Sequence, residues 1–142
     1  MIRAAVHGQN KVDKLEQYAD KGIEIISLDY TKPETISNAL DKVDKIFLHT
    51  LPTPNVMDIS SNLVREAKKK GVTSIVKLSA MGAGSEPTST ILRLHGIEEK
   101  IIQESGIPYT FLRPSAQFGN TIRTQKVFYV PAGDAKMSFV DT

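Results

Sequence analysis

A histidine and a glutamate four residues apart, His95 and Glu99, fall within one predicted helix. Residues at this spacing share a face of an α-helix, so both side chains are expected on the same side. A histidine with an ordinary pKa of about 6.5 can take up or release a proton near neutral pH. His95 is therefore a candidate for acid–base chemistry, and the open alternative is a polar residue at the edge of an apolar helix stripe.

A serine stands at the end of a predicted buried strand. Ile75, Val76 and Leu78 give that strand its apolar, partly β-branched character, and Ser79 opens a loop of small residues that runs to Gly84. Open α/β sheets present ligand-binding groups in such loops, at the carboxyl edge of the sheet. An ordinary flexible loop is the alternative. A serine hydrolase is not indicated, because no Gly-x-Ser-x-Gly elbow is present.

Composition excludes several other classes of site and partner. The three histidines have no metal-ligand spacing among themselves, and the chain contains no cysteine, which suits a reducing cytoplasm. The net charge is +2 without a long basic run, so we expect no nucleic-acid partner. No apolar run approaches the roughly 20 residues that cross a bilayer, and no membrane partner is expected. The sequence therefore predicts a cytoplasmic protein that handles a small molecule.

Short apolar strands alternate with amphipathic helices along the chain. The strands are expected at Ile2–Val6, 23–26, Lys45–His49, 75–78 and Tyr109–Leu112, and the helices at 10–21, 31–40, 56–70 and 89–104. Alternation of this kind predicts an α/β fold in which a three-layer, doubly wound parallel sheet has helices on both faces. Thr31 to Glu34 matches a capping box with a proline in the first turn. Residues 1–142 form one domain, with an irregular tail at 115–142.

Several segments together resemble the NmrA-like family of atypical short-chain dehydrogenase/reductases. They are I-V-K-L-S-A-M-G-A at 75–83, L-H-G at 94–96 and S-G-I-P-Y-T-F-L-R-P at 105–114. R-A-A-V at 3–6 and M-S-F-V-D at 137–141 resemble an early and a late strand of the family. The resemblance covers nearly the whole chain in the expected order. It implies a Rossmann-like fold that binds NADP or NAD.

The resemblance also implies catalytic roles for two residues. His95 and Glu99 lie where a tyrosine and a lysine usually transfer the proton in the dehydrogenase/reductase superfamily. His95 would donate a proton or polarise a carbonyl group. Ser79 matches the superfamily's substrate-positioning serine. Gly96 lies within the same helix, where glycine costs about 1 kcal/mol relative to alanine, and suggests a close approach of the backbone to the sheet or a cofactor.

Further residues are placed on the cofactor side by the resemblance. His7 lies where the family often has an arginine for the 2′-phosphate of NADP, so the choice between NADP and NAD stays open. Asp29 matches a contact to the adenine side, or it begins the turn before Thr31. Lys77 contacts the cofactor or reaches solvent. The stiff turn after the third strand completes the predicted set with Thr50, Leu51 and Pro52.

The sequence departs from the family at both ends. The glycine-rich G-x-x-G-x-x-G turn, whose backbone approaches the pyrophosphate, is not found in it, and neither is the C-terminal substrate lobe. We therefore expect a central piece of the fold and weak dinucleotide binding. Without the family's first strand, Ile2–Val6 and Lys45–His49 would either pair directly, giving strand order 2-1-3-4-5, or be bridged in a homodimer.

Two classes of function follow from these expectations. The first is an NAD(P)H-dependent reductase of small carbonyl or quinone-like compounds, with His95 and Ser79 at the substrate oxygen. The second is a non-catalytic regulatory module that senses a dinucleotide or binds a partner. The missing glycine-rich turn disfavours the first class for this chain alone, and the retained His95 and Ser79 do not exclude it.

Overall fold

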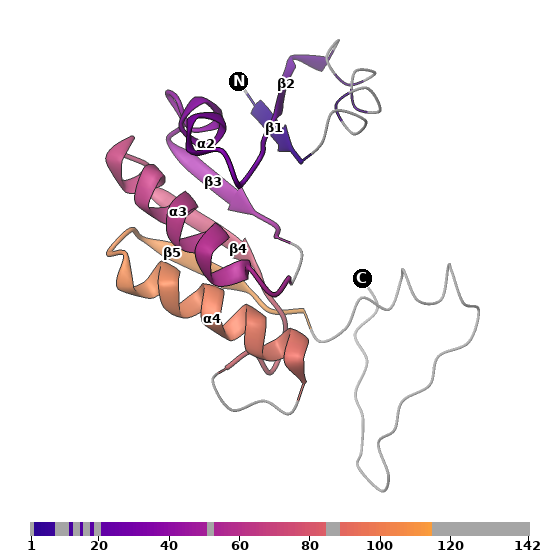
Figure 1. The fold of residues 1–142 in the computed structure, drawn as a ribbon, viewed down its shortest axis with the longest axis vertical. Helices are drawn as coiled ribbons and strands as arrows, with labels where there is room; N and C mark the ends of the chain where they lie inside the picture. The colour runs from indigo at the N-terminus through magenta and orange to yellow at the C-terminus, as the bar shows by residue number, and fades with distance from the viewer. Residues whose placement is uncertain are drawn as a thin grey trace, which may run out of the picture.

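Parallel strands and helices alternate as the sequence predicts. The computed structural model describes residues 2–7, 12, 15, 18, 21–50, 53–84 and 89–114. Its elements are β1 (Ile2–Val6), β2 (Ile23–Ser27), α2 (Pro33–Ala39), β3 (Lys45–Leu48), α3 (Val56–Lys69), β4 (Ser74–Leu78), α4 (Thr90–Glu104) and β5 (Tyr109–Leu112) (Figure 1). The helix expected between the first two strands and the tail at 115–142 fall largely or wholly outside the described residues. The α/β class is confirmed.

The strands form two sheets rather than one. β1 pairs with β2, and β3, β4 and β5 form a separate sheet in that order, with every pairing parallel. The direct pairing of β1 with β3 is not formed, so the expected order 2-1-3-4-5 was wrong for this structure. A cavity of about 680 Å³ lies between the two strands, lined by Ile2 and Ala4 on one side and by Ile46 and Leu48 on the other.

An arginine anchors the smaller sheet and helps to explain why the gap stays open. Arg3 on β1 pairs with Glu24 on β2, where its Nε lies 2.8 Å from a carboxylate oxygen. Its Nη1 donates hydrogen bonds to the carbonyl oxygens of Ala39 and Asp41, at 3.1 and 2.7 Å, at the end of α2. These carbonyls have no partner within the helix, so the guanidinium satisfies them. The anchor fixes β1 to the end of α2 and not to the edge of β3.

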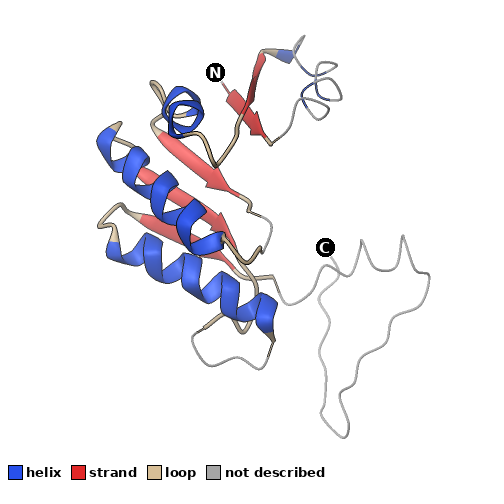
Figure 2. Cartoon of the chain, viewed as in Figure 1, coloured by secondary structure: helices blue, strands red, loops and turns tan. Residues whose placement is uncertain are grey.

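The described helices cover one face of the larger sheet. Figure 2 shows α3 and α4 side by side on the same side of β3, β4 and β5, and α2 packs against α3. Their apolar stripes share one core with the strands, whose most buried members are Ile36, Ala67, Ile75 and Ile102. On the other face, Phe47 is 63% exposed. The expected second layer of helices is therefore not seen in the part of the chain that the structure describes.

The helix ends agree in part with those predicted from the sequence. Gly71 and Gly106 come just after α3 and α4 and both have a φ of +77°, the left-handed conformation that glycine adopts without strain. Pro33 occupies the first turn of α2 as expected, but the predicted capping box was wrong. The N-cap residue is Lys32, without a side-chain cap. Thr31 does not cap the helix because its hydroxyl donates to Asp29 instead.

Candidate functional site

The predicted site residues gather at the carboxyl ends of the strands. His7 directly follows β1, Asp29 and Thr50 lie two residues beyond β2 and β3, and Ser79 directly follows β4. Lys77 is the next-to-last residue of β4. Parallel strands bring such positions to one edge, where α/β proteins bind ligands. Leu51 and Pro52, which the sequence analysis also assigns to the cofactor side, lie outside the described residues.

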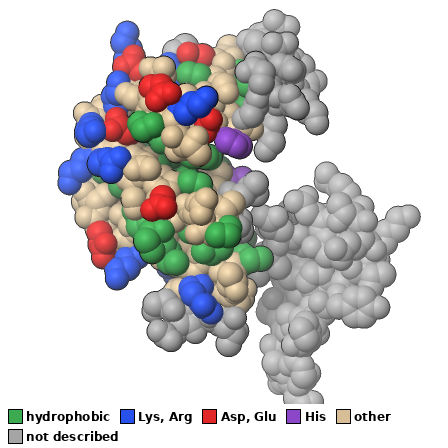
Figure 3. Space-filling model, in the orientation of Figure 1, with side chains coloured by type: hydrophobic (Ala, Val, Ile, Leu, Met, Phe, Trp, Pro, Cys, Tyr) green, Lys and Arg blue, Asp and Glu red, His purple; other side chains and the backbone are tan. Residues whose placement is uncertain are grey.

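A cleft of about 920 Å³ opens at this edge. Its lining includes His7, just after β1, and Tyr30, after β2. It also includes His49, Thr50 and Asn55, which lie between β3 and α3. Figure 3 shows histidine side chains beside a hollow on this face of the molecule. The cleft thus brings together two of the predicted cofactor residues, His7 and Thr50. Asp29, Lys77, Ser79 and His95 are not part of its lining.

The residues beside the cleft on the N-terminal side are held in place by local contacts. His7 Nδ1 lies 3.0 Å from the carbonyl oxygen of Leu28, which can only accept, so Nδ1 donates. The His7 ring stacks on Tyr30 with their centroids 5.8 Å apart. Asp29 accepts hydrogen bonds from the Thr31 amide and hydroxyl, at 2.9 and 2.7 Å, and these bonds lower its pKa. Asp29 therefore begins the turn before Thr31, one of its two predicted roles.

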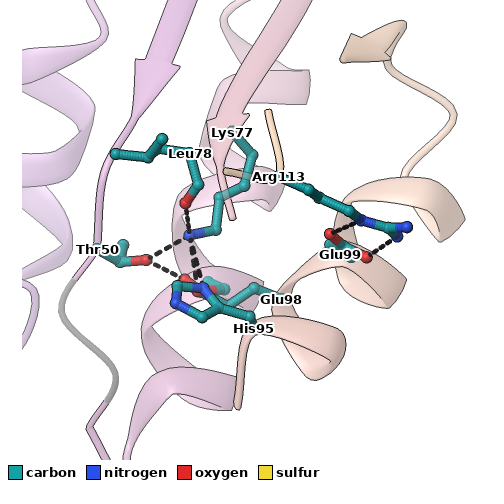
Figure 4. A network of polar contacts seen from close by, with 8 residues as sticks. Thr50, Lys77, Leu78, His95, Glu98, Glu99 and Arg113 are labelled. Carbon is teal, nitrogen blue, oxygen red and sulfur yellow. Dashed lines mark hydrogen bonds and ion pairs between the residues drawn. The ribbon is translucent and has the colours of Figure 1, made fainter. Parts of the chain in front are cut away.

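Lys77 is buried in an ion pair. Its Nζ lies 2.9 Å from Oε2 of Glu98 on α4, and neither side chain exposes any surface (Figure 4). The suggestion that Lys77 reaches solvent was wrong. Ile75 and Lys77 are two residues apart in β4, so their side chains lie on the same face of the strand. This is the face on which α3 and α4 pack, and the helices enclose the lysine. Its predicted contact with the cofactor stays a prediction.

Other polar groups complete this buried cluster. The Lys77 ammonium also donates to the Leu78 carbonyl at 2.8 Å and to the Thr50 hydroxyl at 3.2 Å. Glu98 Oε1 accepts from the hydroxyls of Thr50 and of Ser60 on α3, the latter at 3.1 Å. Because Thr50 also lines the cleft, it connects the buried pair with the candidate ligand site.

Glu98 and Ser60 were not identified from the sequence. Glu98 lies three residues after His95, a spacing that also places side chains on one face of a helix. That spacing is the only local signal. Its ion pair with Lys77 joins residues 21 positions apart and depends on how α4 packs on β4.

His95 lies at the border of the buried cluster, with its side chain 12% exposed. Its Nδ1 is 3.5 Å from Lys77 Nζ and 3.6 Å from Glu98 Oε2. Burial lowers the pKa of His95, and the Lys77 charge lowers it further, whereas Glu98 and Glu99 oppose the shift. The neutral imidazole is therefore favoured near neutral pH.

Glu99 does not serve as the close partner of His95 that its spacing suggested. Its carboxylate pairs with the guanidinium of Arg113, whose Nε lies 2.8 Å from Oε1, and a second contact joins the Nη2 and Oε2 atoms. Figure 4 shows this pair directed away from the His95 side of α4. Arg113 directly follows β5, so the pair ties the helix to the end of that strand.

Ser79 carries a buried hydroxyl without a partner. The residue is 4% exposed, and its amide donates to the Leu112 carbonyl at 2.7 Å. Its Oγ forms no hydrogen bond with any residue that the structure describes. A buried polar group in this state is costly unless a ligand or water satisfies it. The position therefore fits a residue that binds a ligand oxygen.

Gly96 marks a close backbone approach, although not the one expected. A Cβ atom at this position would lie 2.3 Å from the carbonyl oxygen of Gly84. The loop after β4 thus packs directly on α4, one residue from His95. The nearest neighbour in the protein is this loop rather than the sheet. The same contact holds the loop that begins at Ser79 against the helix.

Similarity to known proteins identifies the family. The sequence profile of a family described as NAD(P)H-binding matches residues 2–139. The chain belongs to this NAD(P)H-binding family. Among the residues that the structure describes, no group of three or more histidine, cysteine, aspartate or glutamate side chains could hold a metal ion. Nor does any described helix have the length and apolar character that crossing a membrane requires.

Relatives within the NAD(P)H-binding family include reductases. The chain is 30% identical over 134 residues to an NAD(P)H azoreductase of Xenophilus azovorans, covering 90% of the chain and 47% of the relative. It is 28% identical over 106 residues to an NmrA-like family domain-containing oxidoreductase of Aspergillus flavus, covering 68% of the chain and 34% of the relative. The NmrA-like resemblance is thus confirmed.

A solved structure supports the Rossmann-like fold. An NADPH-dependent quinone oxidoreductase of Escherichia coli, solved with NADPH, matches with a TM-score of 0.73 and 28% identity, covering 87% of this chain and 42% of that one. The chain therefore spans less than half the length of these three relatives. The chain therefore matches part of the fold of a protein that was solved with NADPH bound.

Proposed function

We propose that this chain is part of an NAD(P)H-dependent reductase of small carbonyl or quinone-like compounds. The observation that carries the proposal is the Ser79 hydroxyl, which is buried at the carboxyl end of β4 and has no partner in the described part of the chain. Hydrogen bonding to an oxygen of a bound compound would satisfy it. His95 lies on the helix against which the same loop packs.

The dinucleotide would lie in the cleft at the carboxyl edge. His7 and Thr50 line this cleft, and Asp29 lies in the turn beside it. A bound nicotinamide supplies a hydride. Ser79 would then orient the substrate oxygen and His95 would stabilise the negative charge that develops on it. The family membership and the quinone-reducing and azo-reducing relatives support this assignment.

The test is oxidation of NADPH by the purified chain with a small benzoquinone as acceptor, at millimolar NADPH. Ser79→Ala and His95→Ala are each expected to lower kcat by roughly a hundredfold or more. Ser79→Ala should leave the melting temperature nearly unchanged, because the lost hydroxyl has no partner. Gln103→Ala, at an exposed position of α4, is the matched control and should keep wild-type turnover.

Each result decides between the two classes of function. Dinucleotide binding without any NADPH oxidation would refute the reductase and favour a dinucleotide-sensing or partner-binding module. Turnover that is unchanged in both variants would remove His95 and Ser79 from the reaction even if the chain proved to be a reductase.

A further inference from the structure

Lys77 supplies the one hydrogen-bonding contact that the described residues make to the His95 ring. Its Nζ lies 3.5 Å from Nδ1 of His95. A lysine ammonium carries three donors and no acceptor, so the histidine nitrogen that faces it must be the acceptor. Nδ1 is then unprotonated, and a neutral His95 carries its proton on Nε2.

The neighbouring carboxylate does not compete for this contact. Glu98 Oε2 lies 3.6 Å from Nδ1, beyond hydrogen-bonding distance. Its Oε1 accepts from Thr50 and Ser60, and its Oε2 lies 2.9 Å from Lys77 Nζ in the ion pair, although Oε2 forms no hydrogen bond with any described residue. The Glu98 charge is therefore satisfied without a proton from His95.

The remaining charged and titratable groups around His95 leave this arrangement intact. Glu99, on the same helix, is held by Arg113. His49, at the end of β3, acts on His95 in the same direction as Lys77 and disfavours a second positive charge. Burial has the same effect. A neutral ring is thus favoured by the groups on β4 and β3 together.

We propose that Lys77 is a positioning residue that fixes neutral His95 with its proton on Nε2, and that His95 acts by donating a hydrogen bond from Nε2 to the substrate oxygen without releasing that proton. The second half rests on the proposed reductase function, whereas the first does not. Nε2 forms no hydrogen bond with any described residue, so this donor is available to a ligand.

The chemistry of the reduction is then defined. The hydride adds to the carbonyl carbon, the electron pair of the C=O π bond moves to the oxygen, and the oxygen takes its proton from water. The hydrogen bond from His95 stabilises the oxyanion that forms in between. Removing one donor of this kind typically lowers kcat by about a hundredfold to a thousandfold.

The direct test is the tautomer of His95, read from the ¹⁵N shifts of its ring nitrogens in the purified, ¹⁵N-labelled chain near pH 7.5. The signals of His95 are assigned by their loss in His95→Gln. A protonated Nε2 with an unprotonated Nδ1 is the expected result. A proton on Nδ1, or on both nitrogens, would overturn the proposal whether or not the chain is a reductase.

A double variant tests the role of Lys77. Lys77→Met with Glu98→Leu removes both charges of the buried pair, which leaves no unpaired buried ion. The ¹⁵N shifts of His95 should then move toward a mixture of the two tautomers. The exposed pair on the same helix, Lys100 and Glu104, is the control, and Lys100→Met with Glu104→Gln should leave the shifts of His95 unchanged. Unchanged shifts in the Lys77 double variant would refute the positioning role.

Kinetics separate a neutral donor from a general acid. His95→Gln retains an N–H donor and should keep kcat within about tenfold of the wild type, whereas His95→Ala loses about a hundredfold or more. The kcat of the wild type should not fall as pH rises through neutrality, as it would for a general acid. If the ¹⁵N shifts show the proton on Nε2 but His95→Ala keeps its turnover, only the role of His95 in the reductase is contradicted. If kcat falls strongly in both His95→Gln and His95→Ala, only the role of His95 as a neutral hydrogen-bond donor is contradicted.

Discussion

Lys77 Nζ and Glu98 Oε2 lie 2.9 Å apart with both side chains fully enclosed between β4 and the helices. Removing two charges from water is costly, and Thr50, Ser60 and the Leu78 carbonyl offset part of that cost by hydrogen bonding to the pair, although Glu98 Oε2 forms no hydrogen bond with any described residue. A buried pair of this kind is weak evidence for stability. It joins α4 to β4.

Breaking this pair on one side should destabilise the protein strongly. Lys77→Met leaves Glu98 charged and buried, and we expect the free energy of unfolding to fall by about 3–5 kcal/mol. Lys77→Met with Glu98→Leu should recover most of that loss. Urea unfolding measures both effects, with Lys100→Met as the exposed control. A double variant no more stable than Lys77→Met would contradict the expected coupling.

The pH dependence of stability should include a contribution from His95. Burial and Lys77 lower its pKa in the folded state. As pH falls below the unfolded value of about 6.5, the unfolded chain binds a proton that the folded chain does not, and stability declines. Above that value the contribution is fully present.

The comparison of the wild type with His95→Gln isolates this contribution, because His7 and His49 remain in both proteins. The urea midpoint should fall less in His95→Gln than in the wild type between about pH 7.5 and about pH 5.5. An equal fall in both proteins would show that His95 titrates alike in the folded and unfolded states.

Gly96→Ala should be destabilising although alanine favours helices. The new methyl group would lie 2.3 Å from the Gly84 carbonyl oxygen, so the loop after β4 or the helix must move. Overpacking typically costs about 1–3 kcal/mol, more than the gain of about 1 kcal/mol in helix propensity. Thermal unfolding tests this, with Gln103→Ala as the control on the same helix. A more stable Gly96→Ala would show that the loop yields freely.

Dinucleotide binding by the isolated chain should be weak. The sequence contains no G-x-x-G-x-x-G turn to carry the pyrophosphate at a helix N-terminus. Titration calorimetry with NADPH and NADH is expected to show dissociation constants weaker than micromolar. Micromolar or tighter binding would indicate that other groups, in the cleft lined by His7 and Thr50, bind the phosphates.

A homodimer is expected to occupy the open edges of β1 and β3. Within the described residues these strands pair only with β2 and β4, and the cavity of about 680 Å³ separates them. Unpaired, apolar strand edges recruit partners. Light scattering after size-exclusion chromatography should report a dimer, and Phe47→Lys, at an exposed residue lining this cavity, should weaken it.

The control for the dimer is Tyr109→Lys, at an exposed residue on β5, the other edge of the larger sheet. It should leave the dimer intact. A wild-type chain that stays monomeric at high concentration would contradict this expectation.

Much of the architecture and the placement of the site followed from the sequence. Apolar runs and helical stripes are local patterns, and they predicted the described strands and helices almost to the residue. Because parallel strands end at one edge, the same patterns placed Ser79, Thr50 and His7 at the carboxyl ends of the strands, where α/β proteins bind ligands. The NmrA-like resemblance was sufficient to predict the family.

Tertiary structure decided which residues meet. Alternation along β4 put Lys77 and Leu78 on opposite faces, but whether Lys77 was buried depended on the helices that pack there. Its partner Glu98 lies 21 residues away, and no local pattern selects it over Glu99. The separation of β1 from β3 is likewise a tertiary feature, and the contacts of Arg3 with the end of α2 join segments more than 30 residues apart. Local sequence fixes backbone preference over a few residues, whereas ion pairs and strand order depend on contacts between segments far apart in the chain.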